Sequence, residues 1–417
     1  MTVLGLITEY NPFHFGHKHH LEESLNKTNA DFSIAIMSGS FLQRGEPSFI
    51  DKWTKAKMAV NNGVDLVIEL PFIFSSQSAE LFAYGGVKLM DSLKIVDYLS
   101  FGSELGELEP LANIASILLE EPIYYKERLK FYLSTGLSYS QSRSNAFEEY
   151  IDSISPTLQH NYNYKEILDK SNNILGIEYL KALEKTNSKI TPITIKRSGS
   201  GYKDLNISNG FASATAIRNL IKTNSLESIK KLLPIESYLC LEEYLNEYGY
   251  FNYLDNYNQI FLYLIRTAEK NKLKYIMDME EGLENRFVEQ GFKYNDIKVI
   301  IDNIVTKRYP RTRIQRILIH MLNQLDGKIF KELYEHYPAY IRVLGANKNG
   351  LILLNKIKEN SSLPIITKFA DYKHLKNKFL NEILMFDKRG TDLFFLGLNS
   401  SKILSNMDYY VSPYIKQ

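Results

Sequence analysis

Histidine is the residue type that this sequence concentrates most strongly in one place. The 417 residues include eight histidines, and His14, His17, His19 and His20 all lie in the short stretch HFGHKHH. An imidazole N–H can donate a hydrogen bond to a phosphoryl oxygen, whose negative charge grows when a nucleophile displaces a group at phosphorus. The spacing His-x-Gly-His puts His14 and His17 about one helical turn apart. We therefore predict that these two side chains act in phosphoryl or nucleotidyl transfer.

The residues around the histidines predict an anion-binding helix start. Residues 2–8, TVLGLIT, form a short apolar run typical of a buried parallel strand, and a helical pattern extends from Gly16 to about Asn26. Free backbone N–H groups and the positive end of the helix dipole gather at such a start, and a glycine lets a ligand approach the backbone. Lys18 is a further candidate for contact with the same phosphate oxygens.

Two other interpretations of the histidines stay open at this point. His19 and His20 also fit a solvated helix start in which they have no chemical role. His14, His17 and His20 are spaced by three and could hold a metal ion on one helical face. No acidic or further histidine partner stands nearby in the sequence, however, and Asn-Pro would break any helix before Phe13. We therefore predict no metal site here.

The first two hundred residues alternate between strand and helix patterns. After the first strand, short apolar runs that predict further strands lie at 31–37, 64–70, 95–104 and 190–197. This order is typical of an α/β fold with a doubly wound parallel sheet, in which ligands bind outside the carboxyl ends of the strands. The loops that we expect around one crevice follow Thr8, Met37, Phe101 and Lys196.

The second half of the chain has a different pattern. From about residue 225 it is mainly helical, and residues 338–359 suggest a small mixed segment. A chain of 417 residues is too long for one ordinary core. We predict an α/β catalytic domain over 1–222 and a mainly helical region over 223–417.

Composition bounds the classes of protein to consider. The net charge is only +2, so any nucleic-acid surface must be a local patch. The single cysteine, Cys240, excludes a disulfide framework and a thiolate zinc site, and it fits a reducing cytoplasm. The N-terminal residues do not resemble a signal peptide, and no apolar run approaches the roughly 20 residues that span a bilayer. We expect a cytoplasmic protein without a membrane segment.

One such local patch is the segment TKRYPRTRIQR, residues 306–316, which contains no acidic residue. Its basic residues are Lys307, Arg308, Arg311, Arg313 and Arg316. This concentration is typical of a surface that tracks the phosphates of RNA, and Tyr309 could stack on a splayed base. A solvated helix face is the alternative interpretation. Pro310 is expected to break a helix drawn through the patch.

Two motifs together resemble the nucleotidylyltransferase superfamily. The stretch GLITEYNPFHFGHKHHL resembles its HxGH signature, and FASATAIRNLI resembles its Ser-x-Thr-x-Ile-Arg signature, which opens a helix. The resemblance implies a Rossmann-like fold and transfer of adenylate from ATP. It also implies that Ser213 and Thr215 contact the β and γ phosphates and that Arg218 stabilises the leaving pyrophosphate. A surface helix capped by a serine is the alternative for the second motif.

Further stretches narrow the resemblance to one family. In chain order, MSGSFLQRGEPSF, GVDLVIELPF, DYLSFGSE, NNILGIEYLKAL, KRSGSGY and TKRYPRTRIQRILIH look like the bacterial tRNA(Met) cytidine acetate ligases, over nearly the whole chain. The resemblance implies that acetate is activated by ATP to acetyl-adenylate and then transferred to N4 of the wobble cytidine of elongator tRNA(Met). Phe15 departs from the pattern, since relatives often carry a small polar residue there.

The resemblance also implies which residues bind and act. His14, His17 and Lys18 would be catalytic, and Gly102, Asn172 and Arg197 match further ATP contacts. The ATP-binding stretch would be Ile7, Thr8, Glu9, Tyr10, Asn11, Pro12, Phe13, His14, Phe15, Gly16, His17, Lys18, His19 and His20. Without the resemblance, Gly102 would be a plain turn residue and Asn172 an N-cap. Mg²⁺ is expected to help hold the pyrophosphate, but no distinctive carboxylate motif for it is present.

Some assignments stay open. Four charged residues after the second strand are candidates for holding acetate or cytosine, or else for surface ion pairs: Arg44, Glu46, Asp51 and Lys52. An adenylyltransferase that acts on a small phosphorylated acceptor is one rival function. A nucleotide-sensing RNA-binding protein without catalysis is another. The sequence indicates no protein partner, and it does not identify the general base for the cytidine amine.

Overall fold

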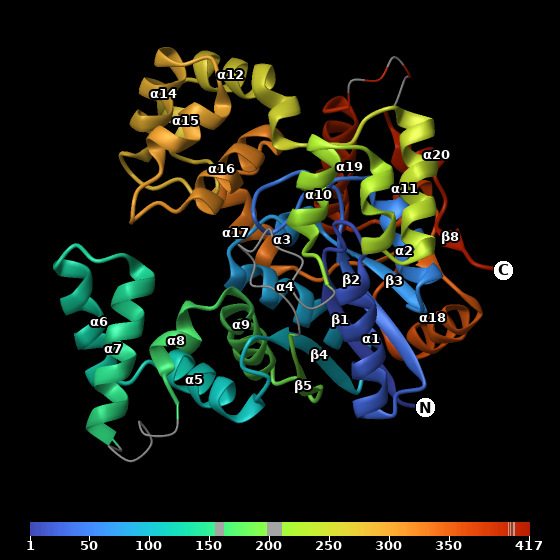
Figure 1. The fold of residues 1–417 in the computed structure, drawn as a ribbon, viewed down its shortest axis with the longest axis horizontal. Coiled ribbons are helices and arrows are strands. Elements are labelled where there is room, and N and C mark those ends of the chain that lie inside the picture. Colours follow the sequence, from blue (N-terminus) through green and yellow to red (C-terminus); the bar gives the residue numbers. More distant parts are fainter. Residues whose placement is uncertain (155–161, 198–210, 399, 401, 403–404) are drawn as a thin grey trace.

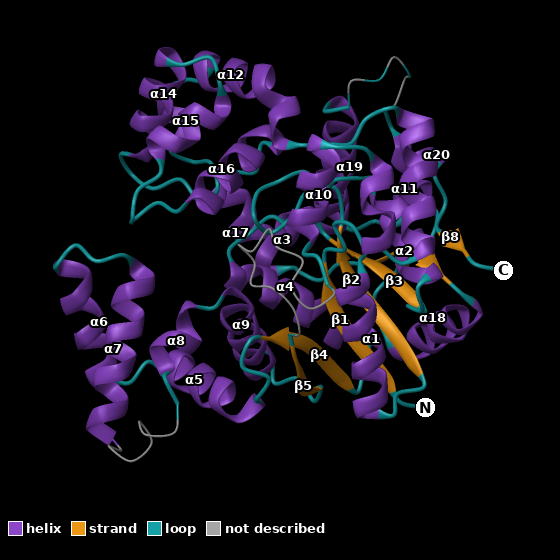
Figure 2. Cartoon of the chain, viewed as in Figure 1, coloured by secondary structure: helices purple, strands orange, loops and turns teal. Residues whose placement is uncertain are grey.

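The structure is a computed structural model, and it describes residues 1–154, 162–197, 211–398, 400, 402 and 405–417 (Figure 1). Residues 198–202, the SGSGY part of the motif KRSGSGY, lie outside these ranges. A mixed sheet forms the centre of the molecule, and helices cover both of its faces (Figure 2). Within the described part of the chain, no helix is both long and apolar enough to cross a membrane.

Eight strands form the sheet, in the order β5-β4-β1-β2-β3-β6-β7, and β8 pairs with β6. Their bounds are β1 Val3–Thr8, β2 Phe32–Ser38, β3 Leu66–Leu70, β4 Tyr98–Ser103, β5 Thr191–Lys196, β6 Ile341–Ala346, β7 Ile365–Ile366 and β8 Tyr414–Ile415. The pairs among β1 to β5 are all parallel, whereas β3 and β6 are antiparallel. The predicted α/β fold with a doubly wound parallel sheet is confirmed.

The register brings the carboxyl ends of the parallel strands to one edge of the sheet. Thr8 lies beside Met37, and Gly102 lies beside Ile195 in the neighbouring pair of strands. The carboxyl ends of β1, β2, β4 and β5 therefore lie on the same side of the sheet. This is the edge at which open parallel sheets bind ligands.

Alternation along the strands builds two cores. In β2, Ile34 and Ile36 face one core, while Ala35 and Met37 face the other. The helices of the first core include α3 Phe72–Ser75, α4 Ala79–Ser92, α5 Leu108–Glu120, α9 Ser171–Lys185 and α18 Lys348–Asn360. The second core is covered by α1 Phe15–Thr28, α2 Lys52–Asn61, α10 Ala214–Thr223, η2 Leu226–Leu232 and α11 Ile235–Tyr248.

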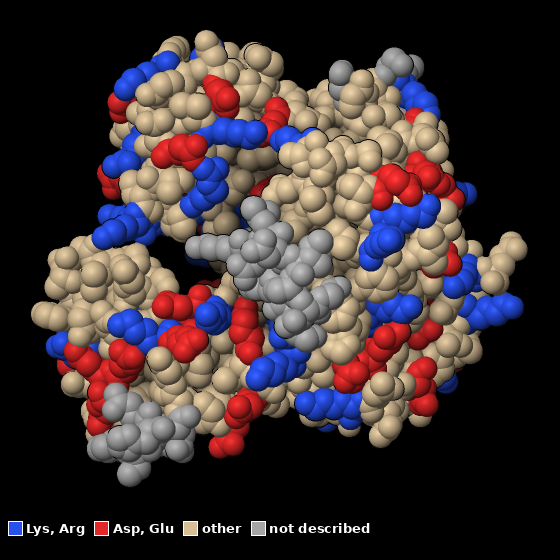
Figure 3. All heavy atoms as spheres, in the orientation of Figure 1, with Lys and Arg blue, Asp and Glu red and all other residues tan. Residues whose placement is uncertain are grey.

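Two helical lobes extend from this body (Figure 1). The first consists of α6 Ile123–Ser134, α7 Tyr139–Ile154 and α8 Tyr164–Asp169. The second follows η3 Leu254–Tyr257 and consists of α12 Asn258–Thr267, α13 Lys270–Leu273, α14 Leu283–Lys293, α15 Ile297–Ile304, α16 Arg311–Asn323 and α17 Gly327–Glu335. Figure 3 shows the surface hollowed between the lobes, with acidic and basic side chains interspersed around the hollow.

The C-terminal segment returns to the sheet after the second lobe. The mixed segment expected over 338–359 is β6 followed by α18, and the chain continues through η4 Phe369–His374, α19 Lys378–Leu396 and α20 Met407–Tyr410. Buried ion pairs tie this segment down: Lys52 contacts Glu69 at 2.9 Å and Asp408 at 2.8 Å, and Arg342 contacts both of these carboxylates. The predicted boundary at residue 222 remains a proposal, and the sheet does not end there.

Candidate active site

The two histidines of the HxGH motif form the start of α1. His14 is the N-cap, and its Nδ1 accepts a hydrogen bond from the Gly16 N–H at 3.0 Å. The Nδ1 of His17 accepts from the His14 backbone N–H at 3.3 Å. A Cβ on Gly16 would come within 2.8 Å of the His14 ring, so only glycine leaves room for this cap. Because both Nδ1 atoms accept, each neutral ring carries its proton on Nε2.

The environment keeps these two rings neutral. They stack with centroids 3.8 Å apart. Burial, followed by the charges of Arg197 and Arg218, lowers the pKa of His14 to about 3. Burial, followed by His14, lowers the pKa of His17 well below its ordinary value. The pair therefore presents two neutral Nε2–H donors at pH 7.

The turn between β1 and α1 is held by aromatic packing and by one amide. The rings of Tyr10 and Phe13 lie 5.0 and 5.6 Å from the ring of His17, and both residues are buried. The Asn11 Oδ1 accepts from the Phe49 N–H at 2.6 Å, which attaches the turn to the loop before α2. These contacts restrict the positions that the histidine rings can take.

A small hollow of about 80 Å³ opens beside the histidines. It is lined by His14, Gly16, His17, His19, His20, Gly102, Ile195, Lys196 and Arg197. The structure therefore brings the motif together with Gly102 and Arg197, two of the distant residues expected at the ATP site. A Cβ on Gly102 would lie 3.2 Å from the Cγ of Arg197, so glycine lets the arginine lie close to β4.

The other two histidines of the cluster have their own contacts. The Nε2 of His20 lies 3.1 Å from the Ser100 Oγ, and burial, followed by Arg197, lowers the pKa of His20 to about 4. The ring of His19 stacks against Phe211 at 5.6 Å. Among the described residues, no group of three or more His, Cys, Asp and Glu is arranged to hold a metal ion.

Asn172 lies next to Arg197 but is not a helix cap. The N-cap of α9 is Lys170, so Asn172 is the second residue of the helix, and the N-cap alternative is wrong. Its Nδ2 donates to the Glu104 Oε1 at 2.7 Å, and its Oδ1 accepts from Arg197 at 3.5 Å. Glu104 thus fixes the amide that meets Arg197. Sequence reasoning did not single out Glu104, whose only signal is its place after the fourth strand.

The second signature motif meets the first through Arg218. Ser213 caps α10 by accepting from the Ala216 N–H at 3.2 Å. Arg218 donates to the Asn11 backbone oxygen at 2.8 Å and lies 3.4 Å from both Glu46 and the Thr215 hydroxyl. Segments two hundred residues apart in the sequence are therefore joined at the turn after β1.

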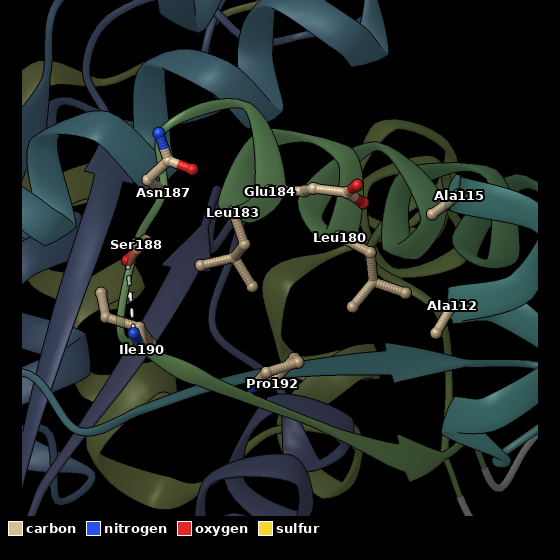
Figure 4. Close-up of a pocket in the computed structure, with 9 residues that line it drawn as sticks. All are labelled: Ala112, Ala115, Leu180, Leu183, Glu184, Asn187, Ser188, Ile190 and Pro192. Carbon is tan, nitrogen blue, oxygen red and sulfur yellow. Dashed lines mark hydrogen bonds between the residues drawn. The ribbon is translucent and has the colours of Figure 1, made fainter. Parts of the chain in front are cut away.

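The structure does not bring Lys18 into this group. Its ammonium lies 3.9 Å from Glu22, and its side chain lines a different hollow with Asn62, Pro234 and Glu236. A separate hollow of about 500 Å³ lies between α5, α9 and the start of β5, where Leu180 and Leu183 reach toward Pro192 (Figure 4). Its acidic Glu184 does not favour an anionic ligand.

Two of the four charged candidates after the second strand have structural roles. Asp51 is buried and caps α2 by accepting from the Trp53 and Thr54 N–H groups at 2.8 and 2.9 Å. Lys52 is fully buried between two carboxylates and does not face the crevice. Of the other two, Glu46 contacts Arg218. The interpretation of Asp51 and Lys52 as substrate ligands is therefore wrong.

The basic segment is more neutralised than its sequence suggests. Arg313 contacts Glu280 at 2.9 Å, Arg311 contacts Asp302, and Arg316 is buried against Asp278 at 2.8 Å. Tyr309 is buried between arginines, so it is not available to stack on a base. Pro310 ends the loop before α16, as expected. The acidic partners lie outside the segment, at Asp278, Glu280 and Asp302. The composition of the segment alone therefore does not reveal them.

A lysine that sequence reasoning missed lies beneath the site. The ammonium of Lys55 is fully buried and donates to the backbone oxygens of Glu9 at 3.2 Å, Ser38 at 2.8 Å and Gly39 at 2.9 Å. It joins the carboxyl ends of β1 and β2. Its signal in the sequence was a lysine on the apolar face of a predicted helix.

Comparison with known proteins places this geometry in a family. The HIGH Nucleotidyl Transferase family model matches residues 1–407. The chain belongs to the HIGH nucleotidyl transferase family. This result agrees with the histidine-capped helix and with the arginine that joins α10 to it.

Within the family, the chain groups with the tRNA(Met) cytidine acetate ligases, as the sequence predicted. It is 45% identical to the protein of that name from Thermoanaerobacter sp. (strain X514) and 44% identical to that from Caldanaerobacter subterraneus subsp. tengcongensis, with 100% of each chain covered. The crystal structure of Thermotoga maritima TmcAL bound with alpha-thio ATP covers 100% of this chain, with 99% of its own length matched, 32% identity and a TM-score of 0.91. The apo form of the same protein gives a TM-score of 0.92 at 33% identity.

Proposed function

We propose that this chain is an ATP-dependent ligase that joins acetate to N4 of the wobble cytidine of elongator tRNA(Met). The observation that carries the proposal is the pair of neutral imidazoles at the start of α1, next to Arg197, in a chain 45% identical to a tRNA(Met) cytidine acetate ligase. ATP is the co-substrate, and a tRNA substrate implies a cytoplasmic reaction.

In the first half-reaction, an acetate oxygen attacks the α-phosphorus of ATP and pyrophosphate leaves. The product is acetyl-adenylate, a mixed anhydride whose leaving group is AMP. The Nε2–H groups of His14 and His17 would donate to phosphoryl oxygens that gain charge, and one such donor in a dry site contributes roughly 3 kcal/mol at the transition state. Arg218 and the start of α10, with Ser213 and Thr215, would hold the leaving pyrophosphate.

Mg²⁺ is part of this proposal only as an ion carried by the substrate. Mg²⁺ usually binds through one or two carboxylates together with phosphates. The part of the chain that the structure describes offers no group of three or more metal-ligating side chains.

In the second half-reaction, the cytidine amine attacks the acetyl carbonyl and AMP leaves. A loop cytidine is unpaired, so it enters a pocket at little cost. The cations that we assign to tRNA contact are Lys307, Arg308 and Arg311, because they are exposed. Arg308 pairs with Glu280 and Arg311 pairs with Asp302 at the surface, where such pairs are weak and phosphates can replace the carboxylates. Arg313 and Arg316, the other two of the basic segment, support the loop that contains Asp278.

One assay tests this function. The protein is incubated with ATP, labelled acetate and tRNA(Met), and both pyrophosphate and labelled tRNA are measured. Acetate-dependent pyrophosphate release with label in the tRNA is the expected result. Adenylation of a small phosphorylated acceptor instead, or ATP binding without turnover, would contradict the proposal and favour one of the two rival functions.

A further inference from the structure

Glu9 directly follows the carboxyl end of β1, beside the loop that follows β2. Its Oε1 accepts from the Gln43 N–H at 2.7 Å. Gln43 is itself fixed, because its Nε2 donates to the Gln77 backbone oxygen at 2.9 Å. Gln43 follows β2 and Gln77 follows β3, so the loops after three neighbouring strands fix the position of the Glu9 carboxyl group.

The surroundings make Glu9 more basic than an ordinary carboxylate. Burial raises the pKa of Glu9, and this effect outweighs the opposing effects of the Gln43 N–H and of the cations Lys55, Arg44 and Arg218. The residue as a whole is only partly buried. A carboxylate with a raised pKa is a suitable general base near neutral pH.

The other titratable groups near Glu9 have other partners or keep their protons. The Lys55 ammonium donates to three backbone oxygens. Burial and the charge of Glu9 raise the pKa of Tyr179, so it stays neutral. The Nδ1 lone pairs of His14 and His17 already accept backbone N–H groups, and their Nε2 atoms carry protons. Neither ring can take up another proton without losing its bond. Glu104 accepts from Asn172 and from the Asn173 N–H, and Glu46 pairs with Arg218. Among these groups, Glu9 is the base that the geometry leaves for the acceptor substrate.

The approach of an RNA base also favours this side of the edge. The loop that contains Gln43 packs directly on α16, since a Cβ on Gly45 would lie 2.2 Å from the Arg316 nitrogen. Helix α16 begins at Arg311, three residues after the exposed Arg308. A nucleotide bound by these cations would therefore arrive beside the loop that positions Glu9.

We propose that the Glu9 carboxylate accepts the proton that the cytidine N4 amine loses during acetyl transfer. The inference rests on the proposed function. The N4 lone pair forms a bond to the acetyl carbon, and the bond from that carbon to the AMP oxygen breaks. AMP leaves with the electron pair, one N4 proton passes to Glu9, and Glu9 later releases this proton to water. No oxidant or further reactant is needed.

The test is Glu9→Gln, which keeps an oxygen acceptor for the Gln43 N–H and removes the proton acceptor. Measured from preformed acetyl-adenylate, so that ATP binding does not enter the readout, acetyl transfer to tRNA(Met) should fall by about 10²- to 10⁴-fold, and any loss of acetate-dependent pyrophosphate release should be much smaller. Acetyl-adenylate should accumulate. Glu9→Asp should recover part of the transfer. Glu127→Gln, on the exposed face of α6, is the control with the same change of charge.

Two results would overturn the assignment. One is acetyl transfer by Glu9→Gln at the wild-type rate, and the other is a parallel loss of both half-reactions in Glu9→Gln and Glu9→Asp. The pH dependence adds a readout that a structural role would not move: wild-type transfer from preformed acetyl-adenylate should fall toward acidic pH, and that of Glu9→Gln should be nearly flat. Wild-type protein that makes no acetyl-adenylate would instead refute the proposed function.

Discussion

At the scale of single residues, catalysis by the histidine pair depends on which ring nitrogen carries the proton. The backbone N–H groups at the start of α1 occupy the Nδ1 atoms of His14 and His17, so Nε2–H donors remain for a phosphate. The sequence motif predicted the pair and its role as donors. It could not predict that the rings are neutral, because this follows from their burial and from Arg197 and Arg218.

His17→Ala should abolish most adenylate formation. Loss of one preorganised donor typically costs about 10²- to 10³-fold in rate, and the substitution also removes the acceptor for the His14 N–H. Acetate-dependent exchange of pyrophosphate into ATP measures this step, and tRNA binding should change little. His374→Ala, on an exposed part of η4, is the control. Exchange at the wild-type rate would remove His17 from the chemistry.

Stability should depend on pH through His14. Its pKa is about 3 in the folded protein, against about 6.5 for an unperturbed histidine. The unfolded chain binds the proton more readily, so this contribution is complete above pH 6.5 and is lost as the pH falls toward 3. Between pH 7 and pH 5 the free energy of unfolding should fall by about 2 kcal/mol from His14 alone. Urea unfolding of wild type and His14→Asn at both pH values measures the difference, and an identical loss in the two proteins would contradict it.

At the scale of elements, hydrophobic periodicity predicted more than the charges did. The alternation of strand and helix patterns located β1 to β5 and the helices between them. Each of these strands pairs with another strand from the first half of the chain, so the order of elements was enough to indicate one sheet. The sequence predicted a mixed segment over 338–359 but not the bounds of strand β6 within it. The partner of this strand, β3, lies some 270 residues away, so no local pattern indicates the pairing. The basic segment was misread in part, because Asp278 and Glu280 neutralise it from outside.

The arginines around α16 should separate into two groups. Replacing Lys307, Arg308 and Arg311 by Gln should weaken tRNA binding and reduce the slope of log K against log salt by about 0.7 to 0.9 for each phosphate that is no longer neutralised.

Replacing Arg316 by Gln leaves Asp278 buried without its partner, so the free energy of unfolding should fall by about 3 kcal/mol. Binding titrations at several salt concentrations and urea unfolding measure these effects. An unchanged salt slope in the triple variant would locate the RNA surface elsewhere.

At the scale of the whole molecule, segments that are distant in the sequence complete the candidate active site and a buried cluster of ion pairs. Arg218 reaches the turn after β1, and Asp408 near the C-terminus pairs with Lys52 from α2 and with Arg342 from β6. The sequence indicated the first of these meetings through two signature motifs. It gave no sign of the second, because Lys52 lies in a polar stretch and buried ion pairs have no periodicity.

Asp408→Asn should destabilise the whole molecule and not only its C-terminal segment. The substitution removes the carboxylate that Lys52 and Arg342 share, while both cations stay buried. Breaking a buried ion pair typically costs about 3 to 5 kcal/mol. Thermal unfolding, followed in the variant and in the exposed control Asp371→Asn, should show a lower midpoint for Asp408→Asn alone. Equal midpoints would show that the charge cluster does not hold the C-terminal segment to the sheet.

The central claim is that acetate attacks the α-phosphorus held by the imidazole pair, and oxygen-18 tests it most directly. The protein is supplied with acetate that carries oxygen-18 at both oxygens, with unlabelled ATP and with tRNA(Met). Mass spectrometry then measures the oxygen-18 content of AMP, pyrophosphate and inorganic phosphate. Attack at the α-phosphorus leaves one acetate oxygen on AMP for every acetyl group transferred, so AMP should gain one heavy oxygen and pyrophosphate none. Heavy oxygen in pyrophosphate or inorganic phosphate, with unlabelled AMP, would contradict the account.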